Sequence, residues 1–215
     1  MTITYPKRAQ AKQANRTRLI DAARHLFAIN GYQTTKLRDI ADYAGLHVQT
    51  LYRHFSSKDE LANAAAKDVI ERCREIFETA PEGQSTFVTW HGYISWVVNG
   101  LAHLGWSHKR QQLRAASSLM NDSFLVIVYS GYEDLLTEYL ARDFQLNPKV
   151  DRLPRMVASS LCSINEVAMK RCAGLDTGND VLDDLDALLT ENLGVIEDAE
   201  KIFSSHLKSR KPTSG

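Results

Sequence analysis

Apolar residues recur at helical spacing along most of the chain. Between Leu19 and Phe27 they fall at i, i+3, i+4, i+7 and i+8, the pattern of a helix that buries one face. The pattern ends at Gly31, and glycine commonly ends helices because it adopts positive φ without strain. We expect a first helix of about 15 residues that ends at this glycine.

Two shorter apolar patterns follow, over residues 37–44 and 48–55. Thr34 or Thr35 can begin the first of these helices, because either hydroxyl can accept a hydrogen bond from a free main-chain N–H of the first turn. Gly45 lies between the two patterns and suits a tight turn that requires positive φ. The sequence therefore predicts two short helices joined by a tight turn.

A longer helix is expected next, from about Lys58 to Thr79. Ser57 and Glu60 have the spacing of a capping box, in which each side chain satisfies a free main-chain N–H at the start of a helix. Further helical patterns cover residues 85–104, 107–119, 122–143, 150–173 and 180–206. Apart from fragments such as residues 123–129, no segment alternates between apolar and polar residues, so the fold class is predicted to be all-α.

The composition is that of an ordinary globular protein, since 44% of the 215 residues are hydrophobic and 24% are charged. No apolar run approaches the roughly 20 residues that a membrane-spanning helix needs, and residues 1–18 lack the pattern of a signal peptide. Cys73, Cys162 and Cys172 are too few and too scattered for a disulfide framework. We therefore expect a cytoplasmic location.

Charge is distributed unevenly, although the overall net charge is zero. Residues 1–60 contain 10 Lys and Arg against 5 Asp and Glu, whereas residues 61–215 contain 16 against 21. The basic residues that precede the first acidic residue are Lys7, Arg8, Lys12, Arg16 and Arg18. Such a cluster suits a polyanion, and it is equally typical of a solvated N-terminus that frays, so both interpretations stay open at this point.

The stretch from Ala44 to Phe55 brings together a glycine, two histidines, a tyrosine and an arginine. His47 and His54 are seven positions apart, about 10 Å along a helix axis, which is too far for both to bind one metal ion. The stretch contains no H-x-x-x-H or C-x-x-C pattern, and G-x-S-x-G is absent from the sequence. We therefore predict no metal site, no cofactor and no catalytic residue.

The alternative is a helix-turn-helix, in which two short helices pack on a longer one and the second enters the major groove of DNA. The small core against Leu26 and Phe27 would consist of Leu37, Ile40, Ala41, Leu46, Leu51 and Phe55. The polar exterior would consist of Arg38, His47, Gln49, Thr50, Arg53 and His54. These side chains can bond phosphates and base edges.

Six blocks of sequence in this region, in this order and at this spacing, resemble the N-terminal domain of the tetracycline-repressor (TetR) family of bacterial regulators. They are residues 17–27, 30–35, 37–41, 44–46, 50–55 and 57–61, and the match covers about residues 15–62. The resemblance implies an obligate homodimer, with one helix-turn-helix per subunit on each half of a palindromic operator in double-stranded DNA. It also implies a C-terminal helical domain that binds a small-molecule effector and forms the dimer.

The resemblance also implies which residues contact DNA. Those that stand where family members commonly contact phosphates or bases are Thr50, Tyr52, His54 and Lys58. Arg38 stands where a base-reading arginine is sometimes found. Thr35 and Lys36 are placed to hold a phosphate through a side chain and a helix N-terminus.

The chain departs from the commonest family pattern at His47, Val48 and Gln49, where many members have Ser-Lys-Gly or a similar sequence. Gln49 can bond N6 and N7 of adenine. Val48 can lie against a thymine methyl group or pack inward, and His47 can contact DNA or be merely exposed. The departure concerns which operator is recognised rather than whether DNA is bound.

Large apolar side chains concentrate between residues 85 and 145, where all three tryptophans lie. Most residues of this kind form a core, and the resemblance implies that the same helices enclose a ligand. The ligand-binding candidates are Trp90, Tyr93, Trp96, Met120, Phe124 and Tyr129. His91, His103 and His108 can orient a ligand or can be ordinary exposed histidines.

The sequence thus predicts an N-terminal arm and helix-turn-helix DNA-binding domain at residues 1–60 and a helical ligand-binding and dimerisation domain at residues 61–208. A disordered tail is expected at residues 209–215. The predicted function is a transcriptional repressor, not an enzyme, that a small and largely apolar ligand releases from its operator. Two other hypotheses stay open: an adaptor whose helix-turn-helix binds a protein, and an α-helical enzyme that acts on a small molecule.

Overall fold

The computed structural model describes residues 4–104, 122–175 and 184–207, and these residues contain helices and no strands. The helices are α1 (Thr4–Asn30), α2 (Leu37–Tyr43), α3 (Val48–His54), α4 (Lys58–Glu78), α5 (Thr86–Leu104), α7 (Ser123–Phe144), α8 (Leu153–Ala173), α9 (Leu185–Phe203) and the short 3-10 helix η2 (Ser204–His206). The prediction of an all-α fold is confirmed.

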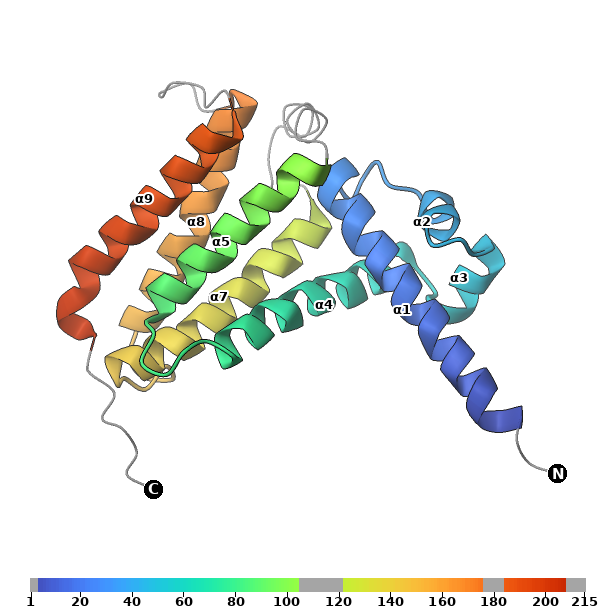
Figure 1. The fold of residues 1–215 in the computed structure, drawn as a ribbon, viewed down its shortest axis with the longest axis horizontal. Helices are drawn as coiled ribbons and strands as arrows, with labels where there is room; N and C mark the ends of the chain where they lie inside the picture. Colours follow the sequence, from blue (N-terminus) through green and yellow to red (C-terminus); the bar gives the residue numbers. More distant parts are fainter. Residues whose placement is uncertain (1–3, 105–121, 176–183, 208–215) are drawn as a thin grey trace.

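The helices form two groups that α4 connects (Figure 1). Helices α1, α2 and α3 lie together at one end of the molecule, with the N-terminus beyond them, and α4 runs from this end into the other group. There α7 packs against α4 and α8, and α9 packs against α5 and α8. Buried apolar residues from all of these helices form one continuous core.

Helix α1 begins much earlier than the apolar pattern predicts. It starts at Thr4 and extends for 27 residues, and the side chains from Arg8 to Ala14 are exposed. This segment consists largely of Ala, Gln, Lys and Arg, which have high helix propensity. The packed part of the helix supplies the nucleus, so the extension needs only propagation and no buried face.

Helices α2 and α3 are joined by the predicted tight turn. Gly45 has a φ of +64°, and Leu46 N donates to Ala41 O at 2.9 Å across the turn. Ile40 and Leu51 are fully buried, so both short helices are held by the core that the sequence predicts. Together α1, α2 and α3 form a helix-turn-helix.

The start of α4 confirms half of the expected capping box. Ser57 Oγ accepts from Glu60 N at 3.1 Å, as predicted. The Glu60 carboxylate, however, accepts from the main-chain N and the hydroxyl of Ser56, both at 2.7 Å. Ser57 and Glu60 therefore both stabilise the turn that leads into α4, Ser57 through the N–H of Glu60 and Glu60 through Ser56.

The later helices begin and end within a few residues of their predicted limits. Residues 123–129, which alternate in part, are helical because Asp122 Oδ1 accepts from Phe124 N and Leu125 N and so caps α7. Asp184 caps α9 in the same way through Ala187 N. The helix expected at residues 107–119 and the tail at residues 209–215 lie outside the described residues.

Candidate DNA-binding surface and ligand cavity

Helix α3 lies on the surface and is anchored from one side. Leu51 and Phe55 are 0% and 1% exposed and face the core. Gln49, Tyr52 and Arg53 fall at i, i+3 and i+4 and are exposed, with Tyr52 at 57%. One face of a fixed helix therefore presents an amide, a phenol and a guanidinium to the solvent.

At the start of α3, His47 and Gln49 lie on the surface, whereas Val48 packs against the core. His47 occupies the N-cap position but its side chain makes no capping hydrogen bond and is exposed. Val48 is half-buried and packs against the core, as the inward interpretation expects. Gln49 is exposed on α3 itself. Of the three positions that depart from the family pattern, Gln49 is therefore the best placed to read a base.

The other candidates near these helices differ in exposure. Thr50 is half-buried on α3. Lys36 and Arg38, at the start of α2, are exposed. Both basic side chains are therefore free of the core and available to a polyanion.

The C-terminal end of α3 lies beside basic residues of α1. Burial lowers the pKa of His54 below its usual value, and the positive charges of Lys12 and Arg16 lower it further. The guanidinium carbon of Arg16 lies 4.6 Å from the centre of the Phe55 ring. Cations from α1 thus lie around the last turn of α3.

The prediction that the Thr35 side chain binds a phosphate is wrong in this structure. Thr35 is 2% exposed, and its hydroxyl donates to Gly31 O at 2.7 Å. Lys36, not Thr34 or Thr35, is the N-cap residue of α2, and its main-chain N donates to Asp39 Oδ2 at 3.3 Å. Thr35 therefore closes the end of α1 instead of facing solvent.

Lys58 is only partly available to DNA. Its ammonium donates to Gln33 O at 3.3 Å and lies 4.2 Å from the centre of the Tyr32 ring. Partial burial lowers the pKa of this ammonium, and the neighbouring carboxylates Asp122 and Asp59 oppose that shift. Lys58 thus ties the start of α4 to the loop that follows α1.

Tyr32 connects this loop to the C-terminal helices. Its main-chain N donates to Asp122 Oδ2 at 2.7 Å, and its hydroxyl donates to Asp59. Burial and the bond to Asp59 raise the pKa of Tyr32 to about 12, so the phenol stays protonated as a donor. Asp122 is 6% exposed and also caps α7, so one carboxylate joins the helix-turn-helix to the C-terminal group.

A cavity of about 400 Å³ lies where α1 and α4 meet α5, α7 and α8. This volume is within the usual range for small-molecule sites. The cavity is lined by Arg24, His25, Ala28, Val69, Tyr93, Ile94, Trp96, Val97, Val98, Gly100, Phe124, Leu125, Val128, Tyr129, Tyr132, Asn165 and Met169. Most of these side chains are apolar or aromatic, which favours an apolar ligand.

The tyrosine hydroxyls, Asn165 and Arg24 of the cavity already interact with protein atoms. The hydroxyls of Tyr93 and Tyr132 share a hydrogen bond, and Asn165 Nδ2 donates to the Tyr129 hydroxyl at 2.7 Å. Arg24 forms ion pairs with Asp21 and Asp68, at 3.2 and 3.4 Å. Burial lowers the pKa of His25, with a smaller contribution from the charge of Arg24.

Four of the six predicted ligand-binding residues line the cavity: Tyr93, Trp96, Phe124 and Tyr129. Trp90 does not, because it is fully buried behind Tyr93 and Tyr132 and packs its ring on both. Met120 lies outside the described residues. No sequence pattern pointed to Arg24 and His25, whereas Asn165, a polar residue within the apolar stripe of α8, was a signal that could have been used.

Of the three candidate histidines, the one whose side chain the structure describes, His91, does not line the cavity. His91 Nε2 lies 3.5 Å from Glu197 Oε1, between α5 and α9. His108 and the side chain of His103 lie outside the described residues. The described part of the chain contains no cluster of metal-binding side chains, and none of its helices has the length and apolarity needed to cross a membrane.

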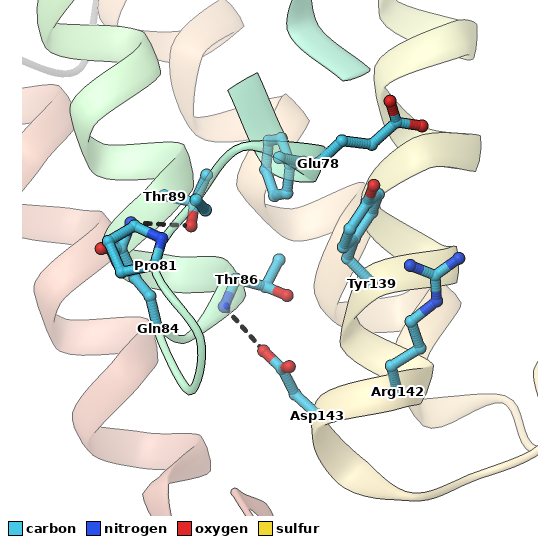
Figure 2. Close-up of a pocket in the computed structure, with 10 residues that line it drawn as sticks. Glu78, Pro81, Gln84, Thr86, Thr89, Tyr139, Arg142 and Asp143 are labelled. Carbon is cyan, nitrogen blue, oxygen red and sulfur yellow. Dashed lines mark hydrogen bonds between the residues drawn. The ribbon is translucent and has the colours of Figure 1, made fainter. Parts of the chain in front are cut away.

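A second, smaller pocket of about 260 Å³ lies at the far end of α4 and α7 (Figure 2). Asp143 Oδ2 accepts there from Thr86 N at 2.6 Å at the start of α5, and Gln84 Nε2 donates to Thr89 Oγ1 at 3.0 Å. Arg142 lies over the Tyr139 ring and pairs with Glu138. These groups hold helix ends together, so the aromatic cavity is the better candidate for a ligand.

A helix-turn-helix with a polar surface helix, joined to a helical body that contains a cavity, is typical of bacterial transcriptional regulators. Residues 19–65 match the family model described as bacterial regulatory proteins, tetR family. The N-terminal region of the chain is therefore similar to that of the TetR family of transcriptional regulators, which are DNA-binding regulators and not enzymes.

Individual relatives agree with this assignment. The chain is 39% identical over 79 residues to the repressor KstR2 of Rhodococcus jostii, which is 35% of this chain and 39% of that protein. It is 26% identical over 152 residues to the regulator TcmR of Streptomyces glaucescens, which is 71% of this chain and 62% of that one. Both alignments span less than two thirds of the relative.

The fold is also that of solved regulators. FadR of Bacillus subtilis, crystallised in complex with stearoyl-CoA, aligns with a TM-score of 0.52 and 23% identity. The alignment covers 84% of this chain and 96% of that one.

Proposed function

We propose that the protein is a sequence-specific DNA-binding repressor, active in the bacterial cytoplasm, that leaves a palindromic operator when a small apolar ligand binds. The observation that carries the proposal is that one helix, α1, both supports the helix-turn-helix and forms a wall of the cavity through Arg24, His25 and Ala28. A ligand in the cavity therefore touches the element that positions α3.

The DNA contacts proposed for α3 follow from its exposed face. Gln49 is placed to read a base edge, Tyr52 to bond a phosphate, and Arg53 to bond a phosphate or a base edge. Thr50 and His54 are half-buried at the margins of this face, and His47, Lys36 and Arg38 are exposed beside it. Lys58 would reach a phosphate only by giving up its bond to Gln33.

The ligand class follows from the lining of the cavity. The rings of Tyr93, Trp96, Phe124, Tyr129 and Tyr132 supply flat apolar surfaces. Arg24 is the permanently charged side chain among the described lining residues, and it is already paired with two carboxylates. An uncharged ligand with a hydroxyl or carbonyl group for the tyrosines and Asn165 fits this set best. The complex of FadR with stearoyl-CoA supports ligand binding within this fold.

A ligand acts by its differential affinity for two arrangements of the subunits. The Tyr32 to Asp122 hydrogen bond and the ring contact between Phe27 and Phe124, 5.4 Å between centres, transmit changes in α7 to the helix-turn-helix. A dimer binds a palindrome only when its two α3 helices lie about one DNA turn, 34–36 Å, apart. A shift of α1 and α4 that changes this spacing releases the operator.

The dimer is proposed to form through α8, with α9 beside it. Met156, Ser160, Ser163 and Val167 follow one another at four, three and four residues and are all exposed, with Met156 at 61% and Val167 at 45%. Apolar and small residues on an exposed helical face suit packing against the same face of a second subunit. Met156→Glu with Val167→Glu should give monomers in analytical ultracentrifugation.

The repressor proposal is tested by selecting bound duplexes from a random-sequence library with the purified protein. The expected product is a sequence with two-fold symmetry and half-sites about 10 base pairs apart, centre to centre. Enrichment of no sequence would overturn the proposal, and binding without salt dependence would favour a protein-binding adaptor.

The cavity is tested with a panel of uncharged aromatic compounds that are screened for release of the selected duplex. Val128 lines the cavity and is 5% exposed, so Val128→Trp should abolish ligand-dependent release and preserve DNA binding. Val126→Trp is the matched control, because Val126 lies on the same helix and is 38% exposed. Equal responses of the two variants would contradict the proposed site.

A further inference from the structure

The N-terminal half of α1 projects past α2 and α3, and no described helix packs on its end (Figure 1). Its basic residues Arg8, Lys12 and Arg16 follow one another at four-residue spacing, and Leu19 and Ala23 continue the row at three and four residues. Five residues with this average spacing lie on one face of a helix. We call Arg8, Lys12 and Arg16 the basic stripe.

The face that carries the basic stripe changes character along the helix. Where it meets the rest of the helix-turn-helix it is apolar, and Leu19 and Ala23 are 0% exposed. Where it projects beyond, it is cationic, with Arg8 and Lys12 exposed and Arg16 half-buried. The basic stripe therefore points to the same side of α1 as α2 and α3.

The basic stripe begins at the end of the proposed recognition helix. The guanidinium of Arg16 lies over the ring of Phe55, the residue that follows α3. Lys12 and Arg16 both lower the pKa of His54, which lies in the last turn of α3. Eight residues separate Arg16 from Arg8, so the stripe extends about 12 Å from this point along the axis of α1. The stripe therefore begins beside the last turn of α3.

Most of the charge of the basic stripe is not balanced by acidic residues in the described part of the chain. None of its three residues forms an ion pair with another described residue. The charge of Arg16 contributes to lowering the pKa of Glu60, whose carboxylate accepts from Ser56 N at 2.7 Å. Like charges four residues apart, and cations near a helix N-terminus, both destabilise a helix. An external polyanion would remove both effects.

We propose that the basic stripe binds backbone phosphates of duplex DNA beside those that α3 contacts. The proposal rests on DNA being the partner of α3, and it adds a contact that is independent of base sequence. The position of the stripe beside α3, the proposed recognition helix, favours DNA over a lipid surface. A membrane is the alternative that the experiment must exclude.

The test uses the full-length variant R8Q/K12Q/R16Q and a 40-base-pair duplex of mixed sequence. Affinity should fall about tenfold or more at physiological salt, and the slope of log K against log salt should decrease by about 0.9 for each phosphate that is no longer neutralised, or roughly 5 per dimer. The control K149Q/R152Q/K201Q removes the same charge from exposed residues and should change neither quantity. Its residues belong to the segment between α7 and α8 and to the last turn of α9, and both lie far from α3 (Figure 1).

A charge-preserving variant and a vesicle-binding measurement distinguish DNA binding from loss of structure and from membrane binding. R8K/K12R/R16K keeps the charge and should restore the slope, while circular dichroism should show equal helix content in all variants. An unchanged slope for R8Q/K12Q/R16Q would overturn the proposal, as would an effect confined to the binding of anionic phosphatidylglycerol vesicles. Because the duplex has mixed sequence, the result stands even if the library selection finds no operator.

Discussion

The main-chain N–H of Tyr32 donates to the carboxylate of Asp122 at 2.7 Å, across 90 residues of sequence. The same carboxylate accepts from two N–H groups at the start of α7. Asp122→Ala therefore removes a helix cap and leaves a buried N–H without its acceptor. We expect the free energy of unfolding, measured in urea, to fall by about 2–4 kcal/mol.

Asp122→Asn isolates the role of this bond in DNA binding. In aspartate, one oxygen caps α7 and the other accepts from Tyr32 N. Asparagine has a single acceptor oxygen, so it can keep the cap but weakens the hydrogen bond to Tyr32. Affinity for the selected operator should fall about fivefold or more if the bond couples the two groups of helices. Asp143→Asn is the control, because Asp143 is equally buried on α7 and bonds Thr86 N far from the helix-turn-helix. A similar decrease in both variants would show general destabilisation instead.

Gln49→Ala should relax base preference without abolishing binding. Gln49 is exposed on α3 and is placed to form a bidentate bond with adenine, worth about 1–3 kcal/mol of discrimination. Repeating the library selection with the variant measures the change, which should affect one or two positions per half-site. Tyr52→Ala should lower affinity for all sequences, so a selective effect at one base pair in that variant would contradict its assigned role.

DNA affinity should rise as pH falls around and below pH 6.5, because of His54. Burial and nearby cations lower the pKa of His54 in the free protein, whereas a phosphate beside it would raise that pKa. The complex then binds more protons than the free protein, so acidification favours it. His54→Gln should flatten the profile measured by fluorescence anisotropy, and His91→Gln, remote on α5, should not.

The same lowered pKa has the opposite effect on folding. The unfolded chain takes up a proton on His54 near pH 6.5, whereas the folded protein does so only at lower pH. The contribution of His54 to stability is thus fully present above the unfolded pKa and declines as pH falls through it. An increase in stability on acidification that depends on His54 would contradict this assignment.

Two glycines should respond in opposite ways to an added methyl group. A Cβ at Gly131 on α7 would lie 2.1 Å from Ile70 Cδ1 of α4, so Gly131→Ala must displace Ile70 or separate the helices, at a cost of about 1–3 kcal/mol. Gly92 in α5 has no atom within 4 Å of that position, and Gly92→Ala should stabilise by up to about 1 kcal/mol. Urea unfolding of both variants measures the contrast.

Periodicity predicted most of the fold because burial determines helices α2 to α9 and the end of α1. The apolar pattern did not predict the exposed part of α1, because Arg8 to Ala14 is helical through propensity and not through burial. The direction of the Thr35 side chain was not predictable either, since its bonds to the end of α1 depend on how the loop folds back. The division of the chain at residue 60 stays a prediction.

The ligand cavity was predictable only in part. Aromatic content identified Tyr93, Trp96, Phe124 and Tyr129, but spacing on α5 did not reveal that Trp90 faces away from the cavity. Arg24 and His25 belong to a segment whose sequence indicates a helix-turn-helix. Their place in the lining depends on how the end of α1 packs against α4 and α7, which is a tertiary contact that local sequence does not encode.

Helix α1 is one unbroken rod from the cavity to its projecting end. Arg24 lies at the cavity, and Arg8 lies 16 residues away, or about 24 Å along the axis. A tilt of about 5° at the cavity end would therefore move Arg8 by about 2 Å, more than the tolerance of a hydrogen bond. If ligand and DNA bind as proposed, α1 would convert a small displacement at the cavity into a larger one at the DNA.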